Sequence, residues 1–155
     1  MKPVGIDQLL AEHPFFRDLT PEYRDLIAGC ATNVRFQAGD FVFREGEPAD
    51  RFYLLRHGSV ALEIHLPRRD ALVIDTLHAG DILGWSWLLE PYTWHLDARA
   101  VQLVRAISLD AACLRGKMES DHELGYALYR RFLPVIARRM QAGRLQLIDM
   151  YGQET

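Results

Sequence analysis

The middle of the chain alternates apolar and polar residues with a period of two, the pattern of strands that bury one face. The alternation is clearest over residues 59–66, where Val60, Leu62 and Ile64 occupy every second position. Turns containing glycine, proline and aspartate separate such runs at short, nearly regular intervals, which is typical of a β-sandwich or barrel. The predicted strands are 33–36, 41–43, 52–56, 59–66, 71–77, 97–101 and 101–109.

Helical patterns flank this β region on both sides. A first helix, 6–12, should end at His13-Pro14, because a residue before proline avoids the α conformation. Thr20 should cap a second helix, and Asp110 a third over 111–118. A long helix, interrupted at Pro134 and Gly143, should then run from about 121 to 150. We therefore expect one domain, mainly β with flanking helices: N-terminal helices over 1–31, a β-roll over 32–109 and C-terminal helices over 110–151.

The predicted long helix carries two apolar stripes. We expect the first stripe to face the β-roll; it consists of Leu124, Leu128, Phe132 and Val135. The second stripe recurs at alternating spacings of four and three, the pattern of a coiled-coil seam; it consists of Tyr129, Leu133, Ile136, Met140, Gly143, Leu147 and Met150. We predict that this second stripe pairs with itself in a parallel homodimer. The alternative is a helix whose whole apolar surface folds back on its own roll.

The stretch 79–101 holds all three tryptophans of the chain. It opens with the turn Gly80-Asp81, continues through Ile82-Leu83, and meets Gly84, where the backbone can bend or approach a ligand closely. A short, bulky apolar run follows, and Pro91 ends it. The candidate binding residues of this stretch are Leu83, Gly84, Trp85, Ser86, Trp87, Trp94, His95 and Arg99.

Composition excludes several classes of function. The 155 residues carry a net charge of −3, which argues against nucleic-acid binding through bulk electrostatics. No apolar run is long enough to span a membrane, and no signal-peptide core is present, so we expect a cytoplasmic protein. Cys30 and Cys113 are far apart in the sequence, and we expect two reduced, buried thiols.

Catalytic and metal-binding patterns are missing from the sequence. We find no Cys/His spacing that suggests a metal site, no paired carboxylates and no phosphate-cradling glycine loop. Ser86 has no identifiable base, and His95 with Asp97 is best explained as an incidental polar pair. We therefore expect neither an enzyme nor a bound metal or cofactor.

Three ordered motifs resemble those of catabolite-activator-type cyclic-nucleotide-binding domains. Residues 39–50, Gly-Asp-Phe-Val-Phe-Arg-Glu-Gly-Glu-Pro-Ala-Asp, resemble the first hairpin of that family. Residues 52–60, Phe-Tyr-Leu-Leu-Arg-His-Gly-Ser-Val, resemble its next strand and glycine turn, and 79–101 its phosphate-binding cassette. The resemblance implies a jelly roll with a long C-terminal helix, and a dimer through that helix. DNA-binding relatives continue into a helix-turn-helix domain, and we expect none here.

The cassette departs from the family at its two polar ligand contacts. Members that bind cyclic nucleotide have a glutamate after the cassette glycine, for the ribose, and that place holds Trp85. The arginine that pairs with the cyclic phosphate is replaced by Trp94 or His95, and neither offers a permanently charged fork. The resemblance therefore implies a non-catalytic regulatory, ligand-sensing module in which cyclic AMP or cyclic GMP is possible but disfavoured.

Three alternatives stay open. The chain could be a protein-interaction subunit of a larger metabolic or redox enzyme complex, with the tryptophans filling their own pocket. It could be a genuine cyclic-nucleotide binder with altered contacts. The pocket could also take another anion, or an aromatic ligand stacked on tryptophan, through His95, Arg99 and the backbone amides after Gly84.

Overall fold

Two four-stranded antiparallel sheets form the body of the protein. The computed structural model describes the backbone of residues 5–153 and the side chains through residue 141. One sheet has the order β1-β8-β3-β6 and the other β2-β7-β4-β5. The strands are β1 Ala31–Phe36, β2 Phe41–Phe43, β3 Arg51–His57, β4 Ser59–Ile64, β5 Leu72–His78, β6 Ile82–Leu83, β7 Asp97–Ala100 and β8 Val104–Asp110. The helices are α1 Ile6–Glu12, α2 Pro21–Ala28, the 3₁₀ turn η1 Ser86–Leu88, α3 Ala111–Ser120 and α4 His122–Gln153.

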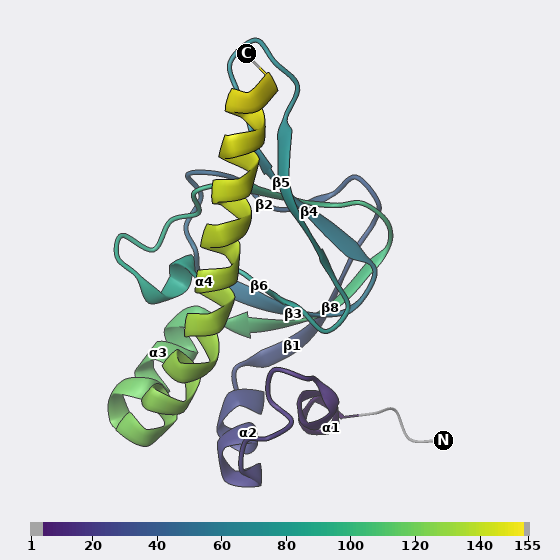
Figure 1. The fold of residues 1–155 in the computed structure, drawn as a ribbon. Coiled ribbons are helices and arrows are strands. Elements are labelled where there is room, and N and C mark those ends of the chain that lie inside the picture. Colours follow the sequence, from purple (N-terminus) through teal and green to yellow (C-terminus); the bar gives the residue numbers. More distant parts are fainter. Residues whose placement is uncertain (1–4, 154–155) are drawn as a thin grey trace.

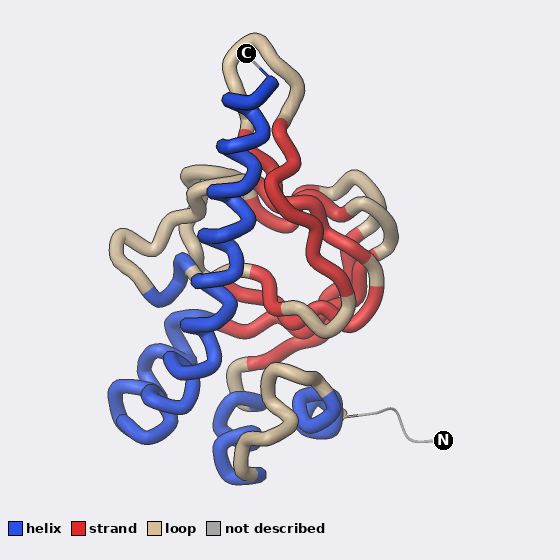
Figure 2. Tube along the Cα trace, in the orientation of Figure 1, coloured by secondary structure: helices blue, strands red, loops and turns tan. Residues whose placement is uncertain are grey.

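The two sheets curl into a roll, and the helices gather along one side and at one end of it (Figure 2). This confirms the predicted fold class, a jelly roll with N-terminal helices and a long C-terminal helix. The local signals behave as expected: α1 ends before His13, and the Thr20 hydroxyl accepts a hydrogen bond from the Tyr23 amide at 3.4 Å. The Asp110 carboxylate caps α3 by accepting from the Cys113 amide at 2.9 Å.

The strict alternation predicted for residues 59–66 does not hold. β4 is buried at every residue from Ser59 to Glu63, and Ile64 is exposed. β4 lies in the middle of its sheet, between β7 and β5, and on its outer face Glu63 pairs with Arg99 of β7. The register with β5 shifts between Leu62 and Glu63, and such a bulge changes which residues face inward. The burial of both faces of β4 and the bulge depend on the strands that pair with it. The residue pattern of one strand does not reveal its partners.

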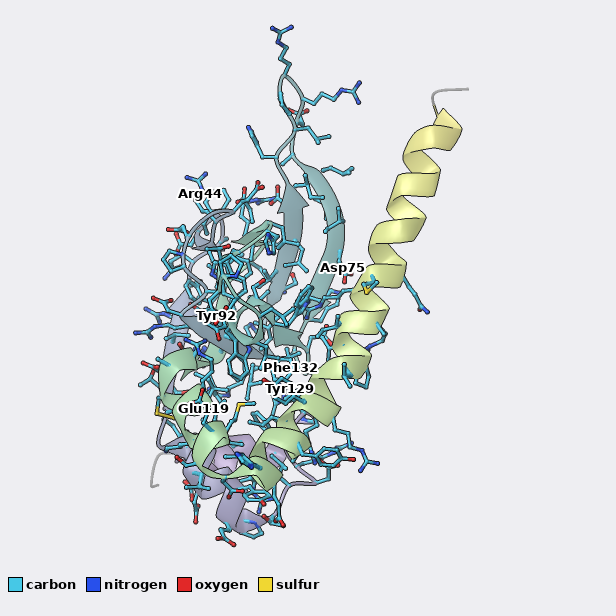
Figure 3. The ribbon with its side chains drawn as sticks, turned by 90° about the vertical axis from the view of Figure 1, so that its left-hand side faces the viewer. Arg44, Asp75, Tyr92, Glu119, Tyr129 and Phe132 are labelled. Carbon is cyan, nitrogen blue, oxygen red and sulfur yellow. A yellow bond between two sulfur atoms is a disulfide. The ribbon has the colours of Figure 1, made fainter. Side chains whose placement is uncertain are left out.

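The long helix α4 runs along the open side of the roll (Figure 1). Its first stripe is buried against the rest of the protein, as predicted: Leu124, Leu128, Phe132 and Val135 are each at most 6 % exposed. Figure 3 shows Phe132 on the side of α4 that faces the roll. The predicted interruption at Pro134 and Gly143 is wrong, because α4 is one continuous helix through both positions. The packing of the first stripe holds the helix across the proline.

The second stripe lies mostly in solvent within one chain. Tyr129, Leu133 and Met140 are 48 %, 63 % and 68 % exposed, and Ile136 is half-buried. Gly143, Leu147 and Met150 complete the predicted seam, and their side chains lie outside the described residues. The helix therefore does not fold its whole apolar surface back on its own roll, and the homodimer stays a prediction.

The prediction of two free thiols is wrong, because Cys30 and Cys113 form a disulfide with a Cα–Cα distance of 5.8 Å. The sheet register brings them together. β1 and β8 pair antiparallel from Ala31 opposite Leu109, so Cys30 before one strand meets the start of α3 after the other. The Asp110 amide also donates to the Cys30 carbonyl at 2.9 Å. The predicted cytoplasmic location stays a prediction.

Candidate functional site

The cassette encloses a cavity of about 240 Å³ between the roll and α4. Gly84 begins the turn out of β6 with a φ of +98°, a left-handed conformation that side chains disfavour, and η1 follows directly. Mainly apolar side chains form the walls. The lining residues are Phe43, Leu62, Ile74, Asp75, Leu83, Gly84, Trp85, Ser86, Trp94, His95, Leu96, Arg139 and Met140.

Trp94 is held in the cavity wall by backbone hydrogen bonds and by an aromatic stack. Its carbonyl accepts from the Gly46 amide at 2.9 Å, and its own amide donates to the Glu47 carbonyl at 3.0 Å. Its indole stacks on the Phe43 ring with centroids 3.7 Å apart and planes 6° from parallel. The motif over residues 39–50 therefore works in this fold as the clamp that fixes a tryptophan in the cavity wall.

Gly84 and Trp94 fit together closely. A Cβ built on Gly84 would lie 2.5 Å from Cη2 of the Trp94 indole, well inside van der Waals contact. The six-membered part of the indole therefore lies directly over the cassette glycine. Because the ring is 5 % exposed, it occupies the interior rather than the surface. The space above the cassette glycine is filled by an aromatic side chain of the protein.

The structure brings together six of the eight candidate binding residues. The cavity is lined by Leu83, Gly84, Trp85, Ser86, Trp94 and His95. Trp87 and Arg99 lie outside it. That any of the six binds a ligand stays a prediction.

Arg99 lies on the outer face of its sheet. β7 buries Ala98 and Ala100, and the alternation of the strand turns Arg99 the other way. Its Nε donates to the Glu63 carboxylate of β4, with the two atoms 2.5 Å apart. The arginine within the cassette is therefore paired, and it points away from the cavity.

Trp87 links the cassette turn to α4. It is fully buried, and its indole stacks on Phe52 of β3 with centroids 4.5 Å apart. The same indole meets the Phe132 ring edge-on at 5.5 Å. The Arg115 guanidinium of α3 donates to the Trp87 carbonyl at 2.7 Å. A displacement of η1 would therefore change the packing of Trp87 against Phe132, on the side of α4 that faces the roll.

Sequence reasoning missed the two lining residues from α4, Arg139 and Met140, because no local signal places them at the cassette. The Arg139 guanidinium donates to the Ile82 carbonyl of β6, just before the cassette glycine. Burial lowers the pKa of Arg139 to about 10, although the nearby carboxylates of Asp75 and Asp81 act in the opposite direction. Figure 3 shows Asp75 on the side of β5 that α4 covers. Arg139 therefore stays protonated at neutral pH and ties α4 to the cassette strand.

A wider cleft of about 820 Å³ lies beside the cavity and shares Arg139 and Asp75 with it. It separates α4 from β5 and the segment around Pro14. Its charged residues carry both signs, because Arg130, Arg131, Arg138 and Arg139 face Asp18, Asp75 and Asp81. Arg131 already donates to Asp18 at 2.8 Å.

The part of the chain that the structure describes contains neither a metal-binding cluster nor a membrane-spanning helix. No group of three or more His, Cys, Asp or Glu residues is arranged there to hold a metal ion. Within the same residues, none of the helices combines the length and apolarity needed to cross a bilayer.

Comparison with known proteins identifies the family. Residues 33–121 match the family model described as the cyclic nucleotide-binding domain, which is more than half of the chain. The chain belongs to the cyclic nucleotide-binding domain family. The match runs from within β1 to the end of α3, so it contains the whole cassette and all strands but the first two residues of β1.

Individual relatives of the family agree with this assignment. A "CRP-like cAMP-activated global transcriptional regulator" of Mycobacterium tuberculosis is 28 % identical over 145 residues, which cover 94 % of this chain and 63 % of the relative. The chain thus spans about three fifths of the length of that relative. A crystal structure from Geobacter metallireducens, described as a candidate cyclic nucleotide-binding protein, is 28 % identical with a TM-score of 0.77. The alignment covers 89 % of this chain and 99 % of that one.

A cyclic nucleotide-binding domain from Methylobacillus flagellatus shares the fold, with a TM-score of 0.81 at 17 % identity. That alignment covers 94 % of this chain and 86 % of the other. The Mycobacterium relative is, by its name, a transcriptional regulator. The chain therefore has the fold of the cyclic nucleotide-binding domain family.

Proposed function

We propose that this chain is a non-catalytic sensor whose cassette cavity takes a ligand without the usual cyclic-nucleotide contacts, and whose output is the position of α4. The observation that carries the proposal is the Trp94 indole over Gly84, in contact distance of the cassette glycine. A cyclic phosphate seated there would have to displace a clamped aromatic ring. The phosphate would also lose its hydration without gaining an ion pair, because Arg99 is already paired with Glu63 on the outer face of the sheet.

Two contacts support α4 as the output element. Trp87 of the cassette turn packs on Phe132, and Arg139 reaches back to the Ile82 carbonyl. The cassette and the helix are therefore joined by two separate contacts. A ligand changes the position of the helix only if it binds two positions of α4 with different affinities, and these contacts are where that difference would arise.

Calorimetry with cyclic AMP and cyclic GMP tests the proposal. We expect no heat of binding for either nucleotide at micromolar concentrations of protein. The Mycobacterium relative, whose name states activation by cAMP, serves as the positive control. Micromolar affinity for either nucleotide would overturn the proposal and favour a genuine cyclic-nucleotide binder with altered contacts.

A protein-interaction role is the second candidate, and the exposed aromatic and apolar residues of α4 favour it. Tyr126, Leu133 and Met140 are each more than 60 % exposed, which is unusual for large apolar side chains on one helix. We propose a second copy of this chain as the occupant, because the spacing of four and three repeats along the helix. A larger metabolic or redox enzyme as the occupant would instead give a protein that is monomeric on its own and bound to that enzyme in its host.

A further inference from the structure

The lining of the cassette cavity is largely apolar. Phe43, Leu62, Leu83, Trp94 and Leu96 come from four different parts of the roll and meet around one space. Phe43, Leu62, Leu83 and Trp94 are buried in the described structure, so the walls are fixed by packing and not by solvent-facing side chains. Polar atoms of Ser86 and His95 stand among these apolar groups. Such a lining favours a ligand that buries carbon atoms and needs few hydrogen bonds.

The charges at the cavity balance one another. Arg139 and Asp75 both belong to the wall, and one carries a positive and the other a negative charge. The Arg139 guanidinium also already donates to the Ile82 carbonyl. An anion entering the cavity would therefore face the Asp75 carboxylate as well as the Arg139 guanidinium, and repulsion by the carboxylate would offset the attraction of the cation. A neutral molecule experiences no such repulsion.

The size of the cavity sets the size of the ligand. An engineered apolar cavity of about 150 Å³ binds benzene, and pockets for drug-sized ligands begin near 300 Å³. The volume of about 240 Å³ lies between the two. One ring, or two fused rings, is the size that fits.

We infer that the cassette cavity binds a small, neutral, mostly apolar ring compound, which lies against Trp94 and touches α4 through Met140. The inference rests on the proposed function, because it names the class of ligand that the sensor takes. It follows from three observations: an apolar lining, a balanced pair of charges and a volume suited to one or two rings. Because Met140 and Arg139 belong to α4, such a molecule contacts the output helix directly.

A matched pair of probes tests the charge and the ring together. Indole and indole-3-carboxylate share one bicyclic ring, and only the second is an anion at neutral pH. We expect calorimetry to detect indole binding with one site per chain, and the carboxylate to bind at least about tenfold more weakly. Equal or tighter binding of the carboxylate would overturn the inference, and so would the absence of indole binding.

Two neighbouring residues of β5 provide a matched pair of variants. Ile74 lines the cavity and is half-buried, whereas Val73 is 41 % exposed and points to the other side of the strand. Ile74→Phe should fill the cavity and weaken indole binding at least about tenfold, while Val73→Phe should leave it within about twofold. Circular dichroism shows whether each variant is folded. Equal effects of both variants would place indole elsewhere and overturn the inference.

The outcomes separate this inference from the proposed function. If neither indole nor a cyclic nucleotide binds, the neutral-ligand inference fails and the proposed sensor stands with another ligand. If cyclic AMP binds with micromolar affinity and Ile74→Phe abolishes that binding, both fail together.

Discussion

Gly84 and Trp94 are in close contact in the cassette. Glycine is favoured at position 84 for two reasons: its φ is +98°, and the Trp94 ring lies where a Cβ would be. The first reason, a positive φ, applies to several turns of this protein. Gly39 has a similar φ of +93°, but a Cβ added there would meet nothing within 4 Å. Comparing the two glycines therefore separates backbone strain from packing.

We predict that Gly84→Ala destabilises the protein more than Gly39→Ala does. Gly39→Ala should lower the free energy of unfolding by about 1–2 kcal/mol, the strain of a left-handed alanine. Gly84→Ala should cost about 1–3 kcal/mol beyond that, because the indole of Trp94 has to move. Urea unfolding of both variants and the parent measures the difference. Equal losses would mean that Trp94 does not rest on the cassette glycine.

His13 is a buried histidine with both ring nitrogens in use. Its Nε2 donates to the Leu55 carbonyl at 3.2 Å, and its Nδ1 accepts from the Phe15 amide at 3.2 Å. This arrangement requires the neutral ring. Burial lowers the pKa of His13, while the Leu55 carbonyl and the Asp81 carboxylate act in the opposite direction more weakly.

The lowered pKa predicts a loss of stability in acid. Above the unfolded pKa of about 6.5 the ring is neutral in both states and pH has no effect through it. As pH falls below that value, the unfolded chain takes up the proton first, so stability falls until the folded pKa is reached. His13→Gln should flatten the pH dependence of the urea midpoint between about pH 7 and 5. An unchanged slope in this variant would exclude His13 as the source.

Among the secondary-structure elements, the pairing of β1 with β8 explains how distant segments meet. The antiparallel register from Ala31 opposite Leu109 places the end of the α2 segment beside the start of α3. The disulfide between Cys30 and Cys113 joins these two ends across a sequence separation of 83 residues. It therefore ties the N-terminal helices to the helix that leads into α4.

We predict that loss of this disulfide lowers stability without changing the fold. A Cys30→Ser, Cys113→Ser double variant should lose about 2–4 kcal/mol of unfolding free energy, since the long loop is no longer constrained in the unfolded chain. Thermal melting with and without a reductant measures the same loss in the parent. The double variant is the control, because a reductant should not shift its melting temperature. Two titratable thiols in the native, non-reduced protein would contradict the bond.

Over the molecule as a whole, α4 presents one face to the roll and another to solvent. The buried face holds Phe132 in an aromatic cluster with Phe15, Phe52 and Trp87. A second apolar stripe is exposed at Tyr129, Leu133 and Met140, of which Met140 also lines the cassette cavity. Figure 1 shows that the helix extends beyond the strands of the roll toward the C-terminus. A second helix of the same kind is the occupant that its repeat spacing fits.

We predict that this face makes the chain a dimer in solution. Light scattering after gel filtration should give twice the mass of the 17.8 kDa chain. Leu133→Glu should give a folded monomer, because it places a charge in the middle of the seam. Leu89→Glu is the control, since Leu89 is 56 % exposed and lies in the cassette loop. A monomeric parent protein would contradict the prediction.

Features that depend on neighbours along the chain were predictable from the residues alone. The caps at Thr20 and Asp110, the end of α1 and the turns at Gly39 and Gly84 follow from short-range rules of backbone conformation and hydrogen bonding. The buried stripe of α4 was predictable in the same way, because helical spacing places Leu124, Leu128 and Phe132 on one face. The ordered motifs also located the cassette, and six of its candidate residues do line one cavity.

Features that depend on the register of distant strands emerged only in the folded chain. The disulfide formed because β1 pairs with β8, and Arg99 found its partner because the pairing of β7 with β4 places Glu63 beside it. Arg139 reached the cassette because α4 continues past Pro134 over the open side of the roll. The local pattern of residues predicts which face of a helix or strand a side chain lies on. It does not predict which residues of the folded chain pack against that face. The charge and size of the cassette cavity are properties of those opposing partners.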